Sequence, residues 1–245
     1  MNYLLIAIAP VLALLTFVYF RDKYEKEPIG MILKGLIFGG IIIFPVAFIE
    51  SLLMKIGGSL PVIPKAAWDG FFVAGFTEEL FKYLIVLLLF FWNRNFNERY
   101  DGIVYAVSVS LGFAGIENIM YVFQHGMTTG LLRAFTAVPA HMIMGTVMGY
   151  YLGLARFTPS RRTYYLIMAL LIPVIIHGFY DFVLMSQHPA LLAIFIPLMA
   201  FYWWIALRNI KKHEQDSAFN PQSIHYEEVA DSDELPPPLP PYGTY

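Results

Sequence analysis

Seven long apolar stretches constrain the fold of this chain more than any other feature of its 245 residues. Each has about the 17–25 residues that a helix needs to cross a bilayer. They cover residues 3–20, 29–54, 70–92, 101–123, 130–155, 163–185 and 190–207. Hydrophobic residues make up 58% of the chain, whereas a soluble domain has about 45–50%. We therefore expect an all-α membrane protein, in which residues 1–210 form a bundle of about seven transmembrane helices.

Lysine and arginine are distributed unevenly among the loops between these stretches. One set of alternate loops and the segment after the last stretch hold Arg21, Lys23, Lys26, Arg94, Arg99, Arg156, Arg161, Arg162, Arg208, Lys211 and Lys212. The other loops hold only Lys55, Lys65 and Arg133. Because basic loops stay in the cytoplasm, we expect a multi-pass protein of the plasma membrane with its N-terminus outside and its C-terminus in the cytoplasm.

The end of the chain differs in character from the rest. Residues 211–245 are polar, acidic between Glu227 and Glu234, and end in "LPPPLPPYGTY", which predicts a disordered cytoplasmic tail with a polyproline II stretch.

The net charge of −2 offers no basic surface for nucleic acid. The absence of cysteine excludes disulfides and thiolate metal sites.

Four of the predicted helices carry ionisable or amide side chains that are costly to place in hydrocarbon. These are Glu78, Glu79, Lys82, Glu117, Asn118, His141, His177 and Asp181. With the orientation above and a rise of about 1.5 Å per residue, all of them lie roughly 6–17 Å below the outer face. Their common depth predicts one hydrated polar chamber in the outer half of the membrane.

Helical spacing assigns directions to these side chains. Glu78 and Lys82 are four residues apart and share a helix face, whereas Glu79 points about 100° away. One glutamate can then face the chemistry while the other braces a neighbouring helix, and Lys82 can pair with either. His177 and Asp181 are also four residues apart, so the carboxylate can orient the imidazole and leave its other nitrogen to act.

Carboxylates and histidines without cysteine suit the activation of water. A glutamate in an apolar pocket can be a general base, and a histidine can stabilise an oxyanion or protonate a leaving amine. The same set could instead bind zinc, with candidate ligands Glu78, Glu117, His141 and His177. The chain has no H-E-x-x-H helix and no G-x-S-x-G turn. Zinc is therefore a candidate cofactor without a sequence motif behind it.

Glycine recurs every fourth residue in the fifth predicted helix, at Gly145, Gly149 and Gly153. Gly35 and Gly39 form a similar pair in the second. Small residues at this spacing let helix backbones approach closely, so we expect these faces to pack within the bundle.

The ordered set of polar motifs resembles that of the PrsW-type intramembrane proteases. "EELFK" (Glu78–Lys82) is similar to their E-E-x-x-K motif and "FAGIEN" to their F-x-x-x-E-N motif. His141 and the "HGFYD" of His177 are similar to the two histidine motifs that follow. The resemblance covers about residues 20–185. The related type II CAAX prenyl proteases have E-E-x-x-x-R and F-x-x-x-H instead, so Lys82 and Glu117 favour the PrsW branch.

The resemblance implies a helical bundle around a water-filled chamber that hydrolyses a peptide bond of a transmembrane protein or peptide. The best-known member makes the first, outward-side cut in an anti-sigma factor. We accordingly expect Glu78, Glu79, His141 and His177 to be catalytic, with Lys82, Glu117, Asn118 and Asp181 supporting them. Two other hypotheses remain open from the residues: a proton-coupled transporter, in which these groups form a relay, and a non-catalytic membrane sensor or scaffold.

Overall fold

A computed structural model describes residues 2–221, apart from the side chain of Asn2. This part of the chain is built of helices and contains no strand, which confirms the all-α prediction. The elements are α1 (Asn2–Arg21), α2 (Ile29–Ile41), α3 (Ile43–Ile56), α4 (Val62–Ala67), the π-helix η1 (Trp68–Phe76), α5 (Thr77–Val86), the π-helix η2 (Leu87–Phe91), α6 (Arg99–His125), α7 (Met127–Phe135), α8 (Ala137–Phe157), the 3₁₀-helix η3 (Pro159–Arg161), α9 (Arg162–Met185) and α10 (Pro189–Gln215).

Six helical stretches among the described residues are long and apolar enough to cross a membrane. They are Tyr3–Arg21, Ile29–Ile56, Arg99–His125, Met127–Phe157, Pro159–Met185 and Pro189–Gln215. The remaining predicted span, 70–92, is helical from α4 through η2, but π-helical segments interrupt it and three charged residues lie near its centre. The chain is thus a multi-pass membrane protein of six or seven spanning helices.

The predicted boundary between membrane domain and tail, at residue 210, lies inside α10. This helix continues to Gln215 because the bundle satisfies its last polar residues. His213 is buried, with Nε2 2.9 Å from the carbonyl oxygen of Tyr150, and Glu214 forms an ion pair with Lys23. The predicted disordered, Pro-rich tail otherwise falls on residues 222–245, outside the described part of the chain.

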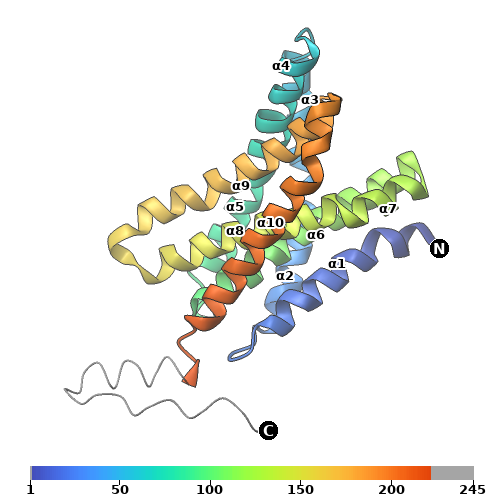
Figure 1. Cartoon of the computed structure of the whole chain (residues 1–245). Coiled ribbons are helices and arrows are strands. Elements are labelled where there is room, and N and C mark those ends of the chain that lie inside the picture. Colours follow the sequence, from blue (N-terminus) through green and yellow to red (C-terminus); the bar gives the residue numbers. More distant parts are fainter. Residues whose placement is uncertain (1, 222–245) are drawn as a thin grey trace.

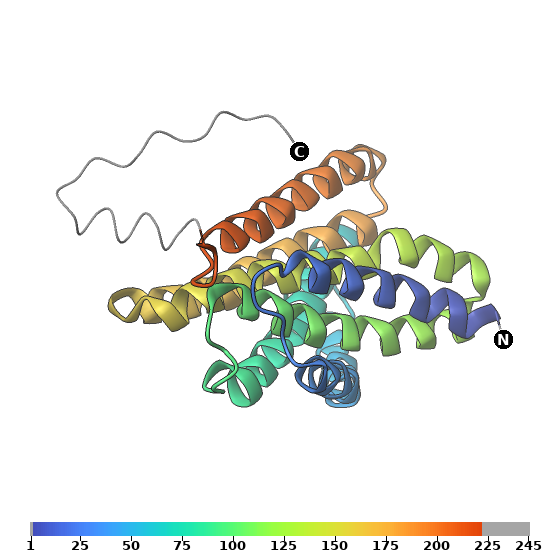
Figure 2. The same cartoon turned by 90° about the horizontal axis from the view of Figure 1, so that it is seen from below.

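Helices α6 and α8 form the centre of the bundle, and the other long helices pack around them. Figure 1 shows hairpins leaving this centre in different directions: α3 and α4 at the top, α6 and α7 to the right, and α8 and α9 to the left. Figure 2 shows α1 running alongside α6 and α7. The central position of α6 explains why the N-terminal half of this helix, Tyr100–Ala114, is buried on every side.

The glycine ladder of α8 packs against α6, as the spacing predicts. A Cβ atom on Gly149 would lie 2.5 Å from the Cα of Ile103, and one on Gly145 would lie 3.0 Å from the carbonyl oxygen of Ala106. Gly35 and Gly39 of α2 approach α6 in the same way, against Ser108 and Val109. Glycine is needed at Gly39 and Gly149 in particular because all of the nearest opposing atoms there are backbone, which cannot move aside.

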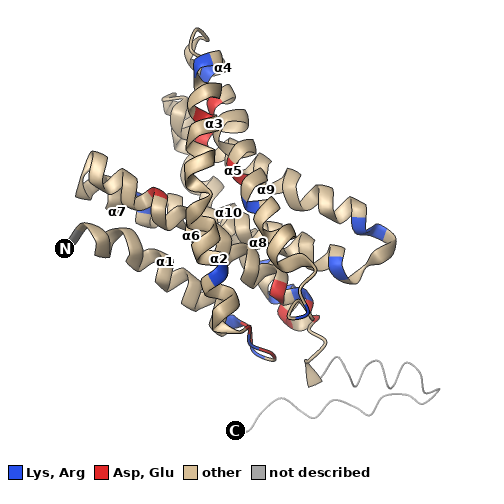
Figure 3. Cartoon of the chain, turned by 180° about the vertical axis from the view of Figure 1, so that it is seen from behind, with Lys and Arg blue, Asp and Glu red and all other residues tan. Residues whose placement is uncertain are grey.

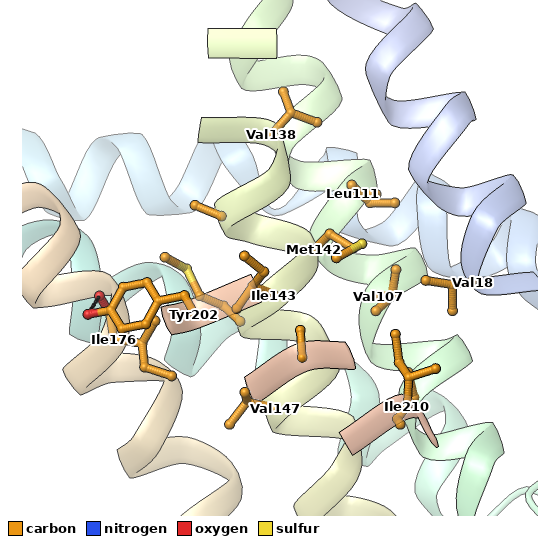
Figure 4. Close-up of a cluster of buried hydrophobic side chains, with 14 of the residues drawn as sticks. Val18, Val107, Leu111, Val138, Met142, Ile143, Val147, Ile176, Tyr202 and Ile210 are labelled. Carbon is orange, nitrogen blue, oxygen red and sulfur yellow. Dashed lines mark hydrogen bonds between the residues drawn. The ribbon is translucent and has the colours of Figure 1, made fainter. Parts of the chain in front are cut away.

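A hydrophobic core fills the space between α1, α6, α8, α9 and α10. Figure 4 shows it around Met142, Ile143 and Val147 of α8. Tyr202 of α10 extends into this core, and its hydroxyl donates a hydrogen bond to the carbonyl oxygen of Ile176 (3.3 Å). The buried polar end of this tyrosine is therefore satisfied.

The segments that the sequence predicts to be cytoplasmic meet at one end of the bundle (Figure 3). Arg21 and Lys23 pair with Glu214, and Arg99 lies 3.4 Å from Asp216. The guanidinium groups of Arg156 and Arg162 both lie over the ring of Trp92, so the fourth basic segment contacts the start of the segment that contains Arg94 and Arg99. The fold thus places all four basic segments on one side, and which side of the membrane this is stays a prediction.

Candidate active site

The site begins where η1 and α5 press against α9. Gly70 and Gly75 of η1 face Gly178 of α9 so closely that a Cβ on Gly75 would lie 3.1 Å from the amide nitrogen of Gly178. Close approach of the two backbones brings the start of α5, with Glu78 and Glu79, beside His177. π-Helical turns often occur at functional sites, and here one immediately precedes the two glutamates.

Lys82 is the hub of the polar cluster. Its side chain is fully buried, and Nζ lies 2.9 Å from Oε2 of Glu78, 2.8 Å from Oε1 of Glu79 and 3.0 Å from Nδ1 of His141. An ammonium group has three donors and no acceptor, so these contacts use all of its hydrogens. Phe113 lies against it, with the ring centroid 4.3 Å from Nζ. Lys82 therefore pairs with both glutamates at once.

The hydrogen bond from Lys82 determines the tautomer of His141. Since Nδ1 must accept from the ammonium group, the neutral ring carries its proton on Nε2, which lies 3.0 Å from Oε2 of Glu117. The same oxygen of Glu117 lies 2.6 Å from a guanidinium nitrogen of Arg133. Both nitrogens of His141 are thus occupied by protein groups.

Arg133 also anchors Asn118. Its Nε donates to the side-chain oxygen of Asn118 (3.2 Å), whose amide nitrogen donates to the carbonyl oxygen of Ala7 (3.2 Å). Asn118 therefore ties α6 to α1 and to α7, and it lies outside the reactive cluster.

His177 lies between two carboxylates. Nδ1 is 3.0 Å from Oε1 of Glu79, and Nε2 is 3.3 Å from Oδ2 of Asp181. The predicted contact with Asp181 is present. The helical spacing also predicted that the other imidazole nitrogen of His177 would be free to act, but Glu79 contacts it. The two imidazole rings of the site are neighbours, with the centroids of His177 and His141 5.5 Å apart.

A cavity of about 420 Å³ adjoins the cluster. One water needs only about 10–15 Å³, so several can enter. Its ionisable lining residues are Glu50, Asp69, Glu78, Glu117, His125, Arg133, His141, His177 and Asp181. Glu79 is absent from this lining and is fully buried. The geometry thus separates the adjacent glutamates, with Glu78 toward the cavity and Glu79 toward α9.

The cavity includes residues that the sequence alone did not assign to the site. Glu50 was detectable as a carboxylate within the predicted span 29–54, and its Oε1 is buried without a hydrogen-bond partner in the described part of the chain. Arg133 was counted among loop residues, yet it lies in α7 and pairs with Glu117. Asp69 and His125 lie at helix ends, where no sequence signal distinguishes them from solvated residues.

Three side chains of the cluster lie close enough together to hold a metal ion. Glu78, Glu79 and His177 each offer one donor atom, and these atoms lie within 4.8 Å of one another. Oε2 of Glu79 is buried and has no hydrogen-bond partner among residues 2–221. Carboxylate oxygens and an imidazole nitrogen fit zinc. Of the ligands predicted from sequence, Glu78 and His177 belong to this group, whereas His141 and Glu117 bond to each other and to Lys82 or Arg133.

Comparison with known proteins gives a consistent result. The model of the PrsW family intramembrane metalloprotease matches residues 27–207. "Protease PrsW" of Bacillus subtilis is 39% identical over 84% of this chain and 92% of its own length. The proteins of the same name from Geobacillus kaustophilus and Clostridioides difficile are 37% and 32% identical, over 84% and 89% of this chain and 89% and 93% of their own lengths. No solved structure matches.

The family model and these relatives, together with a helical membrane fold, identify the chain as an intramembrane peptidase. The chain belongs to the PrsW family of intramembrane proteases. Family membership confirms the resemblance seen in the motifs.

Proposed function

We propose that this protease cuts a peptide bond of a transmembrane substrate by means of a water molecule that Glu78 activates. The observation that carries the proposal is the position of Glu78. It lines the 420 Å³ cavity, is only 6% exposed, and has one oxygen held by Lys82. A carboxylate so placed has a fixed orientation and faces a space that admits both water and a peptide group.

The reaction follows from this placement. Glu78 takes a proton from water as the water oxygen bonds to the carbonyl carbon of the substrate. Arg133 lines the same cavity and supplies N–H groups for the resulting oxyanion, and His177, which lies between Glu79 and Asp181, lines the cavity beside it. When the carbon–nitrogen bond breaks, the proton held by Glu78 passes to the leaving amine. Glu79, Lys82, Asp181 and Glu117 hold these groups in place.

A metal ion is compatible with the same residues. Glu78, Glu79 and His177 would hold zinc, and the bound ion would supply Lewis-acid chemistry and lower the pKa of a coordinated water. In that case Lys82 would still share both carboxylates and offset their negative charge. Zinc analysis of active protein, with His177→Ala as the variant that lacks one ligand, distinguishes this route.

The depth of the site supports a cut near the outer face, as in the first cleavage of an anti-sigma-factor-like regulator. Glu117 lies 18 residues after Arg99 on α6, which is about 27 Å along the helix axis from the basic end. If that end is cytoplasmic, the cavity lies toward the outside.

Cleavage in proteoliposomes tests the role of Glu78. The substrate would be a membrane protein that accumulates uncut in cells lacking the protease. Glu78→Gln keeps the shape of the side chain and removes the base, so we expect a loss of at least about 10²-fold in rate. Glu214→Gln, the same change at the opposite end of the bundle, should cleave normally. Wild-type rates in folded Glu78→Gln would disprove the proposal.

A further inference from the structure

A second group of carboxyl side chains lies at the basic end of the bundle, away from the cavity. Glu25 and Glu27 belong to the connection between α1 and α2, and Asp101 lies in the first turn of α6. Each offers an oxygen, and these atoms lie within 4.8 Å of one another. Asp101 precedes Glu117 by 16 residues on α6, so about 24 Å along the helix separates this group from the active site.

One oxygen of each of the two buried members is held by the protein. Oδ2 of Asp101 accepts from the amide nitrogens of Asn97 (2.8 Å) and Glu98 (2.7 Å), and Oε2 of Glu27 accepts from the hydroxyl of Tyr105. These bonds fix the orientation of both carboxyl groups. They also determine where the remaining oxygens point.

The remaining oxygens receive no hydrogen bond from an N–H or hydroxyl donor. Oδ1 of Asp101, Oε1 of Glu27 and Oε2 of Glu25 are buried and have no such donor within residues 2–221, while the carboxyl groups of Glu27 and Asp101 are close enough to share a proton. Asp101 is 0% exposed and Glu27 is 1% exposed. The carboxyl groups of Glu27 and Asp101 face each other, which requires a proton or a cation between them. Unpaired buried carboxylate oxygens are costly, so either a shared proton or a bound cation is expected there.

No basic side chain neutralises the group. Among the described residues, the ion pairs at this end go to Glu214 and Asp216 instead. The ammonium group of Lys26 is directed at backbone carbonyls, those of Tyr19 and Asp22. Burial also raises the pKa of Glu27 to about 7, because the charged form loses hydration.

We propose that Glu25, Glu27 and Asp101 bind a hard divalent cation, Ca²⁺ or Mg²⁺, that ties the α1–α2 connection to the start of α6. The donors are all carboxylate oxygens, which these ions prefer, and no imidazole or thiolate that would favour zinc belongs to the group. Ca²⁺ binds oxygen at about 2.3–2.6 Å, so three oxygens that all lie within 4.8 Å of one another can reach the same ion. Water completes the coordination shell.

Ion binding to the full-length protein in detergent tests this site. Protein purified with a chelator and returned to chelator-free buffer is titrated with Ca²⁺ and, separately, with Mg²⁺. Calorimetry reports stoichiometry and affinity, and thermal unfolding reports stability. We expect one ion per chain and a rise in melting temperature of roughly 5–10 °C at a hundredfold excess over Kd. The ion that binds more tightly identifies the occupant.

Variants locate the ion. Glu25→Gln and Glu27→Gln should each weaken binding at least tenfold, whereas Glu214→Gln, a neighbouring acid that already has basic partners, should bind like the wild type. Glu78→Gln should also bind normally, which separates this ion from any metal at the active site. Failure of the wild type to bind either ion would mean that a shared proton fills the site and would overturn the proposal. So would unchanged affinity in both Glu25→Gln and Glu27→Gln, or loss of binding in Glu78→Gln.

Discussion

At the scale of single residues, the buried Lys82 holds the polar cluster of the candidate active site together. A fully buried ammonium group is tolerated because two carboxylates and one imidazole surround it at 2.8–3.0 Å. The same contacts stabilise Glu78 and Glu79, since without the positive charge of Lys82 they would be two adjacent buried anions. The pair of acids and the lysine are therefore energetically dependent on one another.

Replacement of this lysine should be more damaging than replacement of another membrane lysine. Lys82→Met leaves both glutamates without their cation, and breaking a buried pair in this way costs about 3–5 kcal/mol. Lys34→Met is the matched control, because the ammonium group of Lys34 lies 5.6 Å from the ring centroid of Phe90 and forms no ion pair within residues 2–221. Thermal unfolding in detergent should show a large drop in stability for the first variant and a small one for the second.

A compensating change tests the cause of that loss. If uncompensated charge is responsible, adding Glu78→Gln and Glu79→Gln to Lys82→Met should recover part of the stability without restoring cleavage. Equal stability of Lys82→Met and Lys34→Met would refute the role of Lys82 as the hub.

At the scale of elements, backbone contact between helices positions the side chains of the candidate active site. His141 lies on α8, and its distance from α6 is set four and eight residues further on, by Gly145 and Gly149. In the same way, the glycines of η1 and α9 set the distance between Glu79 and His177. Small shifts of these helices would separate groups that now lie within 3.0 Å of one another.

Adding a single methyl group at the α6–α8 contact should disturb the bundle. The Cβ of Gly149→Ala would overlap the carbonyl oxygen of Gly102 and the Cα of Ile103, so we expect a destabilisation of about 1–3 kcal/mol and reduced cleavage. Gly30→Ala is the matched control, because no atom lies within 4 Å of the added methyl group. It should be neutral or stabilise α2 by up to about 1 kcal/mol. Thermal unfolding and cleavage rates of the two variants test this prediction. Equal losses of stability in Gly149→Ala and Gly30→Ala would contradict the packing argument.

At the scale of the whole molecule, the fold divides the chain into a basic end and an end that contains the polar cavity. Contacts such as those of Trp92 with Arg156 and Arg162 join loops that are distant in sequence. The positive-inside rule then predicts that the cavity faces outward.

The absence of cysteine allows a direct measurement of orientation. Ser59, between α3 and α4, and Ser160, between α8 and α9, are both exposed and lie in loops predicted to be on opposite sides. We expect Ser59→Cys to react with a membrane-impermeant maleimide in cells whose cytoplasmic membrane is intact, and Ser160→Cys to react only after permeabilisation. The reverse labelling would invert the topology and place the cavity toward the cytoplasm.

The sequence by itself determined the helical membrane fold, the family and the gathering of polar residues from four helices. The lengths of the apolar stretches and the order of the motifs predict these features, because both depend only on spacing along the chain. Helical angle also predicted that Glu78 and Glu79 point in different directions. Those features required no knowledge of which helix packs against which.

Only the tertiary structure decided which polar side chains contact one another. It placed Glu79 on the second nitrogen of His177, occupied both nitrogens of His141, and added Glu50 and Arg133 to the cavity. It also brought Glu25 and Glu27 to Asp101, more than 70 residues away in the chain. Such contacts depend on the crossing and rotation of whole helices, which the packing of glycines and core side chains sets collectively and which no single segment encodes.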